Sequence, residues 1–136
     1  MSFATSGPLQ EAVFSALSTD AALAALVGGA IYDAVPRGAL PALYVRLGSE
    51  EVRDASDCSG AGAEHRITVS VITSHSGFAQ AKAAAGAVSD VLHGAKLALS
   101  RGRLVYLRFD RAKAERRESA ATRQIDLRFV ARVQDD

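Results

Sequence analysis

Apolar and polar residues alternate in four segments of the chain, 42–47, 64–73, 103–111 and 122–133. Alternation with a period of two is typical of β-strands that bury one face, so each segment predicts such a strand. The last two segments are expected to pair in antiparallel orientation. The residues predicted to face the core are Leu43, Val45, Leu47, Ile67, Val69, Val71, Val105, Leu107, Phe109, Ile125, Leu127, Phe129, Ala131 and Val133.

Three other segments, 8–17, 21–27 and 78–92, repeat their apolar residues at the spacing of helices. Asp20 precedes the second segment and suits a helix cap, because its carboxylate can accept a hydrogen bond from a free N–H of the first turn. Gly28 follows that segment and suits the left-handed conformation that ends many helices. We therefore expect a helical hairpin at the start of the chain and one longer, alanine-rich helix between the second and third strands.

Two segments show neither period. Residues 48–63 are rich in Ser, Asp, Gly and Glu and predict a long polar loop. Residues 112–121 predict either a hairpin loop or an extension of the two strands beside them. The order α-α-β-β-α-β-β predicts an α+β fold, with helices packed on one face of a mainly antiparallel sheet of about four strands. The length of 136 residues fits a single domain spanning 1–136.

Composition favours a soluble protein of a reducing compartment. Cys58 is the one cysteine, so an intramolecular disulfide is impossible. Residues 1–10 lack the basic and apolar regions of a signal peptide. The longest stretch of low charge, 21–32, is too short to span a bilayer. These features predict a cytoplasmic protein without a membrane partner.

Charge is distributed unevenly along the chain. Residues 101–132 contain ten Arg or Lys and four acids, whereas the rest contains six basic residues and eleven acids. This asymmetry suits head-to-tail contacts between copies, or a positive face near nucleic acid, although strands can also simply expose Arg to solvent. Tyr106 is the one aromatic expected on the Arg side of the last two strands, so sequence-specific nucleic-acid binding is not expected. The candidate assembly residues are Glu50, Glu51, Arg53, Asp54, Asp57, Arg108, Arg111, Lys113, Arg116, Arg117 and Arg128.

No group of residues carries an enzyme signature. Cys58 and His65 superficially resemble a nucleophile and its base, but such a pair needs a rigid frame and Cys58 lies in the expected loop. His75, His93 and the other candidate ligands lack the paired spacing of zinc sites. The turn 74–77 precedes a helix and could bind an anion, but capping by its serines is the favoured interpretation. We therefore predict no catalytic, cofactor-binding or metal-binding residues, and no cofactor.

Several stretches together resemble the tail terminator (tail completion) proteins of long-tailed phages and gene transfer agents. They are 23–33 (LAALVGGAIYD), Pro36, 41–45 (PALYV), 65–71 (HRITVSV), 76–78 (SGF), the alanine-rich helix ending at Leu92-His93, 103–109 (RLVYLRF) and 128–133 (RFVARV). The resemblance covers nearly the whole chain and rests on spacing and apolar pattern. Residues 73–75 depart from it, since many members would have an aromatic there.

This resemblance implies a structural protein that is not an enzyme. It implies a hexameric ring of identical subunits that caps the finished tail tube, joins it to the head-side connector or stopper protein, and leaves a central channel for DNA. Such a ring would assemble in the host cytoplasm and then remain at the head–tail junction of the particle. A head–tail stopper or connector is the alternative, followed by an unrelated small enzyme or nucleic-acid-binding protein. Phage, prophage and gene transfer agent all remain open as sources.

Overall fold

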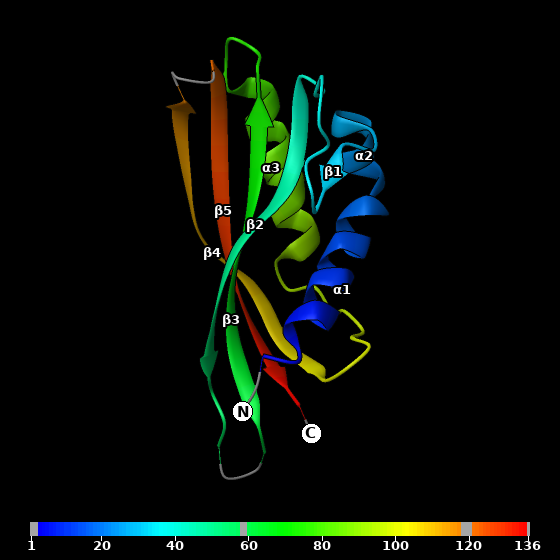
Figure 1. Ribbon diagram of the computed structural model, residues 1–136, viewed down its shortest axis with the longest axis vertical. Helices are drawn as coiled ribbons and strands as arrows, with labels where there is room; N and C mark the ends of the chain where they lie inside the picture. Colours follow the sequence, from blue (N-terminus) through cyan, green and yellow to red (C-terminus); the bar gives the residue numbers. More distant parts are fainter. Residues whose placement is uncertain (1–2, 58–59, 118–120, 136) are drawn as a thin grey trace.

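A computed structural model describes residues 3–57, 60–117 and 121–135 (Figure 1). Its elements follow the predicted order, with one short strand added. They are α1 (Ser6–Ser18), α2 (Ala21–Val27), β1 (Ile31–Tyr32), β2 (Leu43–Asp54), β3 (Gly62–Thr73), α3 (Ala79–Leu92), β4 (Arg103–Arg117) and β5 (Thr122–Gln134).

The described strands form one sheet in the order β1-β2-β3-β5-β4. All neighbours pair antiparallel except β1 and β2, which are parallel. The helices lie on one side of this sheet (Figure 1), so the α+β prediction is confirmed. The predicted count of about four strands is corrected to five within the described residues, because β1 is only two residues long and too short to show an alternating pattern.

The core lies between the helices and the sheet face that they cover. All five residues of β5 predicted to face inward are buried, and so is the stripe of α3 that packs on them. Small alanine side chains bring this helix close to the sheet, so that valine and leucine side chains fill the remaining space. The buried apolar residues of the helices are Leu9, Val13, Leu17, Leu23, Val27, Ala81, Ala84, Ala85, Val88 and Leu92.

Two of the helix ends predicted from the sequence are confirmed by the structure, and one is wrong. Asp20 accepts a hydrogen bond from the Leu23 N–H at 2.9 Å at the start of α2, as predicted. Gly28 ends this helix with φ of 63°, a left-handed conformation that favours glycine. The expected serine cap of α3 is wrong, since Phe78 occupies the N-cap and no side chain makes a capping hydrogen bond there. No helix among the described residues is both long and apolar enough to cross a membrane.

The polar loop predicted for 48–63 is wrong. β2 continues to Asp54 and β3 begins at Gly62, so only 55–61 connect the strands. The pairing shifts register between Leu47 and Glu50, which interrupts the alternation that the sequence shows before this point. In Figure 1, this end of the β2–β3 hairpin extends beyond the helices. None of residues 48–54 of β2 is fully buried, so this part of the strand has no apolar face that a hydrophobic pattern could reveal.

β4 departs from the predicted pattern at two register shifts. The first lies between Leu104 and Tyr106, so that Leu104 pairs with Val133 on the covered face and Val105 is 43% exposed instead of inward. The second lies between Phe109 and Arg111. The strand then continues to Arg117, which confirms the extended-strand alternative for the start of 112–121.

Phe129 should be essential for stability, because its side chain is fully buried at the centre of the sheet. We expect Phe129→Ala to lower the free energy of unfolding by about 3–5 kcal/mol through lost burial and a residual cavity. The matched control is Phe14→Ala on α1, where the ring is 36% exposed and the loss should be less than about 1 kcal/mol. Urea unfolding followed by circular dichroism measures both; equal losses would contradict this description of the core.

Candidate assembly surface and buried polar network

The side of the sheet that faces away from the helices is here called the open face. The register places ten cationic and four acidic side chains on it, and Asp110, close to Arg66 beside the second register shift, adds a fifth acid. The balance, ten minus five, is +5. The fourteen charged residues that the register assigns to the open face are Arg46, Glu51, Arg53, Glu64, Arg66, Arg103, Arg108, Arg111, Lys113, Glu115, Arg117, Asp126, Arg128 and Arg132.

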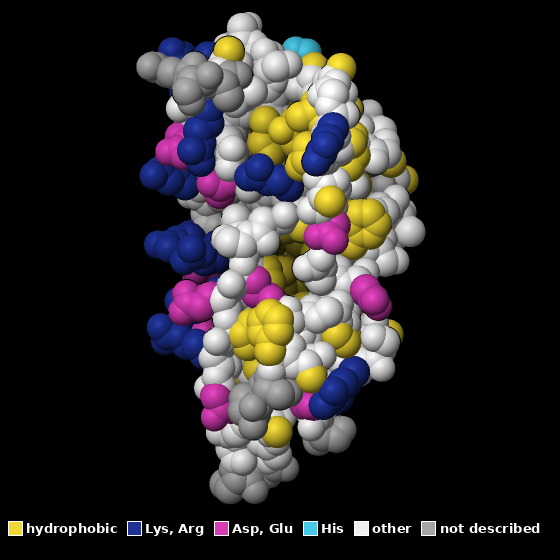
Figure 2. Space-filling view, viewed as in Figure 1, with side chains coloured by type: hydrophobic (Ala, Val, Ile, Leu, Met, Phe, Trp, Pro, Cys, Tyr) yellow, Lys and Arg dark blue, Asp and Glu magenta, His cyan; other side chains and the backbone are white. Residues whose placement is uncertain are grey.

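Half of these cations are held by acids of the same molecule. The ion pairs are Arg53–Glu51 at 3.4 Å, Arg66–Glu64 at 3.0 Å, Lys113–Glu115 at 3.5 Å, Arg117–Glu115 at 3.2 Å and Arg132–Asp57 at 3.4 Å. Within the described ranges, the other five have no ion-pair partner: Arg46, Arg103, Arg108, Arg111 and Arg128. Figure 2 shows Lys and Arg side chains projecting in a row along the left-hand side of the molecule, away from the helices.

The candidate assembly residues lie on two hairpins, which overlap only in the middle of the sheet, where Arg108 is level with Glu51 across β5 and β3. The acids belong to the β2–β3 hairpin and most of the cations to the β4–β5 hairpin, and these hairpins extend from opposite ends of the molecule (Figure 1). The structure therefore does not bring the two groups together within one subunit. Arg116 pairs across the strands with Arg123 and faces the helix side, unlike its neighbours Lys113 and Arg117.

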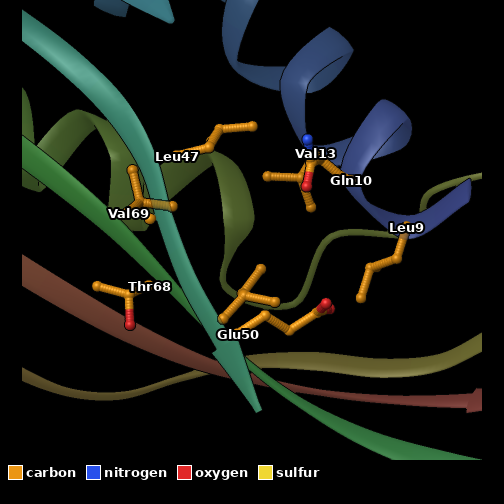
Figure 3. A pocket seen from close by; sticks show the side chains of 9 residues that line it. Leu9, Gln10, Val13, Leu47, Glu50, Thr68 and Val69 are labelled. Atoms are coloured by element: carbon orange, nitrogen blue, oxygen red, sulfur yellow. The ribbon is translucent and has the colours of Figure 1, made fainter. Parts of the chain in front are cut away.

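Glu50 differs from the other acids of its hairpin because its carboxylate is used internally. It extends from β2 toward α1 (Figure 3) and accepts hydrogen bonds from the Ser6 hydroxyl and from His65 Nδ1, the latter at 3.0 Å. His65 Nε2 lies 3.1 Å from the Thr5 hydroxyl. All four groups are satisfied when the His65 proton is on Nδ1 and Thr5 donates to Nε2. This network fixes the start of α1 to β2 and β3.

The order hydroxyl, imidazole and carboxylate is also that of a hydrolase triad. However, Thr5 and His65 are almost completely buried, so a substrate has no access to the hydroxyl. The adjacent cavity, seen in Figure 3 between α1 and the sheet, has a volume of only about 30 Å³, which is room for a water molecule. The network therefore acts in folding. Cys58, the other member of the weighed Cys58–His65 pair, lies outside the described residues.

The alternation of apolar and polar residues in β3 already indicates that His65 faces the core. His65 lies two residues before Ile67 and four before Val69, in the phase that faces the core. The partners Thr5 and Ser6 could not be identified in this way, because sixty residues of chain separate Thr5 from His65. Among the described residues, no group of three or more His, Cys, Asp or Glu is placed to hold a metal ion.

Comparisons with known proteins agree with the resemblance seen in the sequence. Residues 11–134 match the family described as tail completion protein gp17. The chain is also similar to one in a solved structure of the virion of a native gene transfer agent particle, with 62% sequence identity and a TM-score of 0.93. That match covers 98% of this chain and 99% of the other. A comparison with curated proteins finds no significant match.

The network should make stability depend on acid pH through Glu50. Burial alone would raise the pKa of Glu50, but hydrogen bonds from His65 and Ser6 and the charge of His65 lower the pKa below its ordinary value. A carboxyl with a lowered folded pKa stabilises the protein above its unfolded pKa, and this contribution is lost as pH falls through the folded pKa. Wild type should therefore lose stability between about pH 5 and pH 3, and Glu50→Gln should lose less over the same range.

The matched control is Glu51→Gln, which changes an exposed acid on the opposite face of the same strand. It should retain the wild-type dependence on pH. Urea unfolding at a series of pH values measures all three proteins. If Glu50→Gln and wild type gave parallel curves, Glu50 would not be the titrating member of this network.

Proposed function

The chain belongs to the family of the tail completion protein gp17 and is a structural protein of tailed particles, and we propose that it ends the growth of a tail tube as a hexameric ring. The match over nearly the full length of a gene transfer agent particle chain carries this proposal. The ring stacks on the last layer of tail tube protein, presents its other side to the head-side connector, and leaves a channel for DNA. The subunits assemble in the host cytoplasm and remain at the head–tail junction.

The sheet edges support self-assembly because each is covered near one end and free over the rest of its length. On β4, α3 is followed by Gly94, which donates its N–H to the Leu107 C=O at 2.7 Å, and His93 Nδ1 accepts the Phe109 N–H at 3.0 Å. On β2, the short strand β1 pairs only with Val45 and Arg46. The free parts within the described residues are thus 110–117 of β4 and 47–54 of β2, which lie diagonally across the sheet.

A diagonal arrangement suits a closed ring in which the strands are tilted. The four long strands at about 4.8 Å spacing make each subunit about 19 Å wide. A tilt of about 45°, as in closed barrels, offsets neighbouring subunits by a similar distance along the strands, which is about six residues. An offset of this size brings 111–117 of β4 level with 48–54 of β2 in the next copy.

Charge supports the same contact between copies. The free part of β4 has four cations and two acids (Arg111, Lys113, Arg116 and Arg117 against Asp110 and Glu115), whereas the free part of β2, apart from Glu50, has two acids and one cation (Glu51 and Asp54 against Arg53). The two edges differ from each other, so the contact is heterologous, as a ring requires. Glu50 does not contribute to it because its carboxylate binds His65 and Ser6.

Loss of the protein should produce particles with abnormally long tails or tails without heads, because the tube has no other stop. Negative-stain microscopy of particles made without the gene measures tail length directly, and supplying the gene in trans should restore it. Filled heads without tails, leaking DNA, would instead indicate a stopper or connector and contradict this proposal.

The hydrogen bonds of β4 show which of its backbone groups point to the free edge. Phe109 donates to His93 and therefore not to its partner Phe129 on β5. Antiparallel partners alternate between pairs that bond to each other and pairs that do not. Ile125 lies four residues from Phe129, in the same phase, so its partner Ala114 directs its N–H and C=O to the free edge.

Ala114→Pro should abolish ring formation and tail termination while the subunit stays folded. Proline removes the outward N–H, and edge strands tolerate proline because the ladder to the inner neighbour does not need that donor. Ala114→Ser keeps the N–H and serves as the control. Native mass spectrometry and tail-length measurements compare the variants; normal rings and tails with Ala114→Pro would exclude pairing along this edge.

A further inference from the structure

We propose that the open face of the sheet binds the phosphodiester backbone of DNA without reading its sequence. The inference rests on the proposed function only in that DNA passes through the ring. The binding surface has its centre at Arg111 and Arg128, and Arg46, Arg108 and Lys113 lie around them. Side chains project perpendicular to a sheet whereas edge bonds lie in its plane, so this surface remains available when the edges are occupied.

No contact within the subunit compensates the repulsion between two like charges at the centre of the open face. Arg111 and Arg128 are directly opposite each other on β4 and β5, an arrangement that is destabilising for like charges. Neither has an ion-pair partner in the part of the chain that the structure describes. Of the two acids close by, Asp126 already accepts hydrogen bonds from Ser70 at 2.6 Å and Gln124 at 2.7 Å, and Asp110 lies close to Arg66. Within one subunit the two arginines therefore lack a counter-charge, which an external anion supplies.

These arginines line an open groove with neutral donors as well. The groove has a volume of about 600 Å³ and is lined by residues of four strands, among them Ser49, Thr68, Lys113 and the two central arginines. Gly48 leaves space above Thr68, where a side chain would approach the Thr68 carbonyl oxygen to 3.2 Å. Guanidinium groups and hydroxyls together are the donors that commonly bind phosphate oxygens.

The absence of apolar surface favours a polyanion over a protein partner. Stable protein interfaces have an apolar centre from which charged residues are depleted. None of the exposed large apolar residues in the described ranges is among those that the register places on the open face; they are Phe3, Phe14, Leu26, Leu40, Val105 and Phe109. Val130, which is on this face, is buried among its neighbours.

Contacts should be to the backbone and not to the bases. Base recognition on a sheet uses exposed aromatic platforms. Tyr106 is one of three aromatics that the register places on this face, and the Arg108 guanidinium lies over its ring at 5.1 Å. The other two, Tyr32 and Tyr44, are half-buried and contact each other at a centroid distance of 5.9 Å. Affinity should therefore be independent of sequence and strongly dependent on salt.

The test compares DNA binding by wild type and by the double variant Arg111→Gln, Arg128→Gln. Fluorescence anisotropy with a mixed-sequence duplex of about 25 base pairs, from about 25 to 200 mM salt, gives the slope of log K against log salt. Loss of two phosphate contacts should make this slope shallower by about 1.8 and lower the affinity near 50 mM salt on the order of 100-fold. The variant should also unfold at a higher urea concentration in low salt, because the repulsion between the arginines is gone.

Two controls separate a binding face from a general charge effect. Lys82→Gln with Lys96→Gln removes the same net charge from α3 and the segment after it, and should leave the slope close to that of wild type. Arg111→Lys with Arg128→Lys keeps both charges and should also keep the slope. Equal slopes for wild type and the glutamine variant, or no salt-dependent binding at about 25 mM salt, would overturn the proposal.

Failure of this inference can be distinguished from failure of the proposed function. In particles, the single variant Arg128→Gln, which lies on the inner strand β5 and not on a free edge, should form tails of normal length but deliver less DNA. If it instead lost self-association while DNA binding stayed unchanged, Arg128 would belong to a subunit contact and this proposal would be wrong. If tails stayed normal when the protein is absent, the proposal that it terminates the tail tube would be wrong. The proposal of DNA binding by the open face would then still be decided by the anisotropy measurement.

Discussion

Strands are more than twice as long as helices of the same number of residues, and this difference determines which parts of the surface are free. A helix of 13 or 14 residues, such as α1 or α3, spans about 20 Å, whereas strands of 12 to 15 residues span about 40–50 Å. The helices can therefore cover only the middle of one side of the sheet. Both hairpin ends and the whole open face remain available, and the charged residues are concentrated there.

Where the helices cover the sheet, the sequence was sufficient to predict the structure. Ile125, Leu127 and Phe129 alternate without interruption because each must be buried, and all of them are. Residues 48–54 could not be recognised as a strand, since their pairing with β3 imposes no apolar face beyond the helices. Val105 was assigned inward because a register shift changes the phase without any local sign in the sequence.

The candidate surface was predictable in composition but not in arrangement. Charge counts identified the basic C-terminal strands, and the alternation placed Arg108 and Arg128 away from the core. That Arg111 lies opposite Arg128 follows from a register shift that no pattern reveals. Likewise, the inward phase of His65 predicts burial, but only the fold shows that its partners are Thr5 and Glu50. Long-range polar contacts of this kind depend on topology, which a local pattern does not contain.

The charges on the free edge of β4 also select between two ways in which copies could pair. Symmetric pairing of β4 with β4 would bring together two edges that each have four cations and two acids over residues 110–117, and the excess of like charge opposes this contact. Such charges are a common protection of long edge strands against aggregation. Pairing of β4 with the acidic end of β2 removes the repulsion and leaves a new β4 edge free at the other side. In the proposed ring, each addition would then repeat the first, so growth would continue head to tail until the tilt of the strands closed the circle.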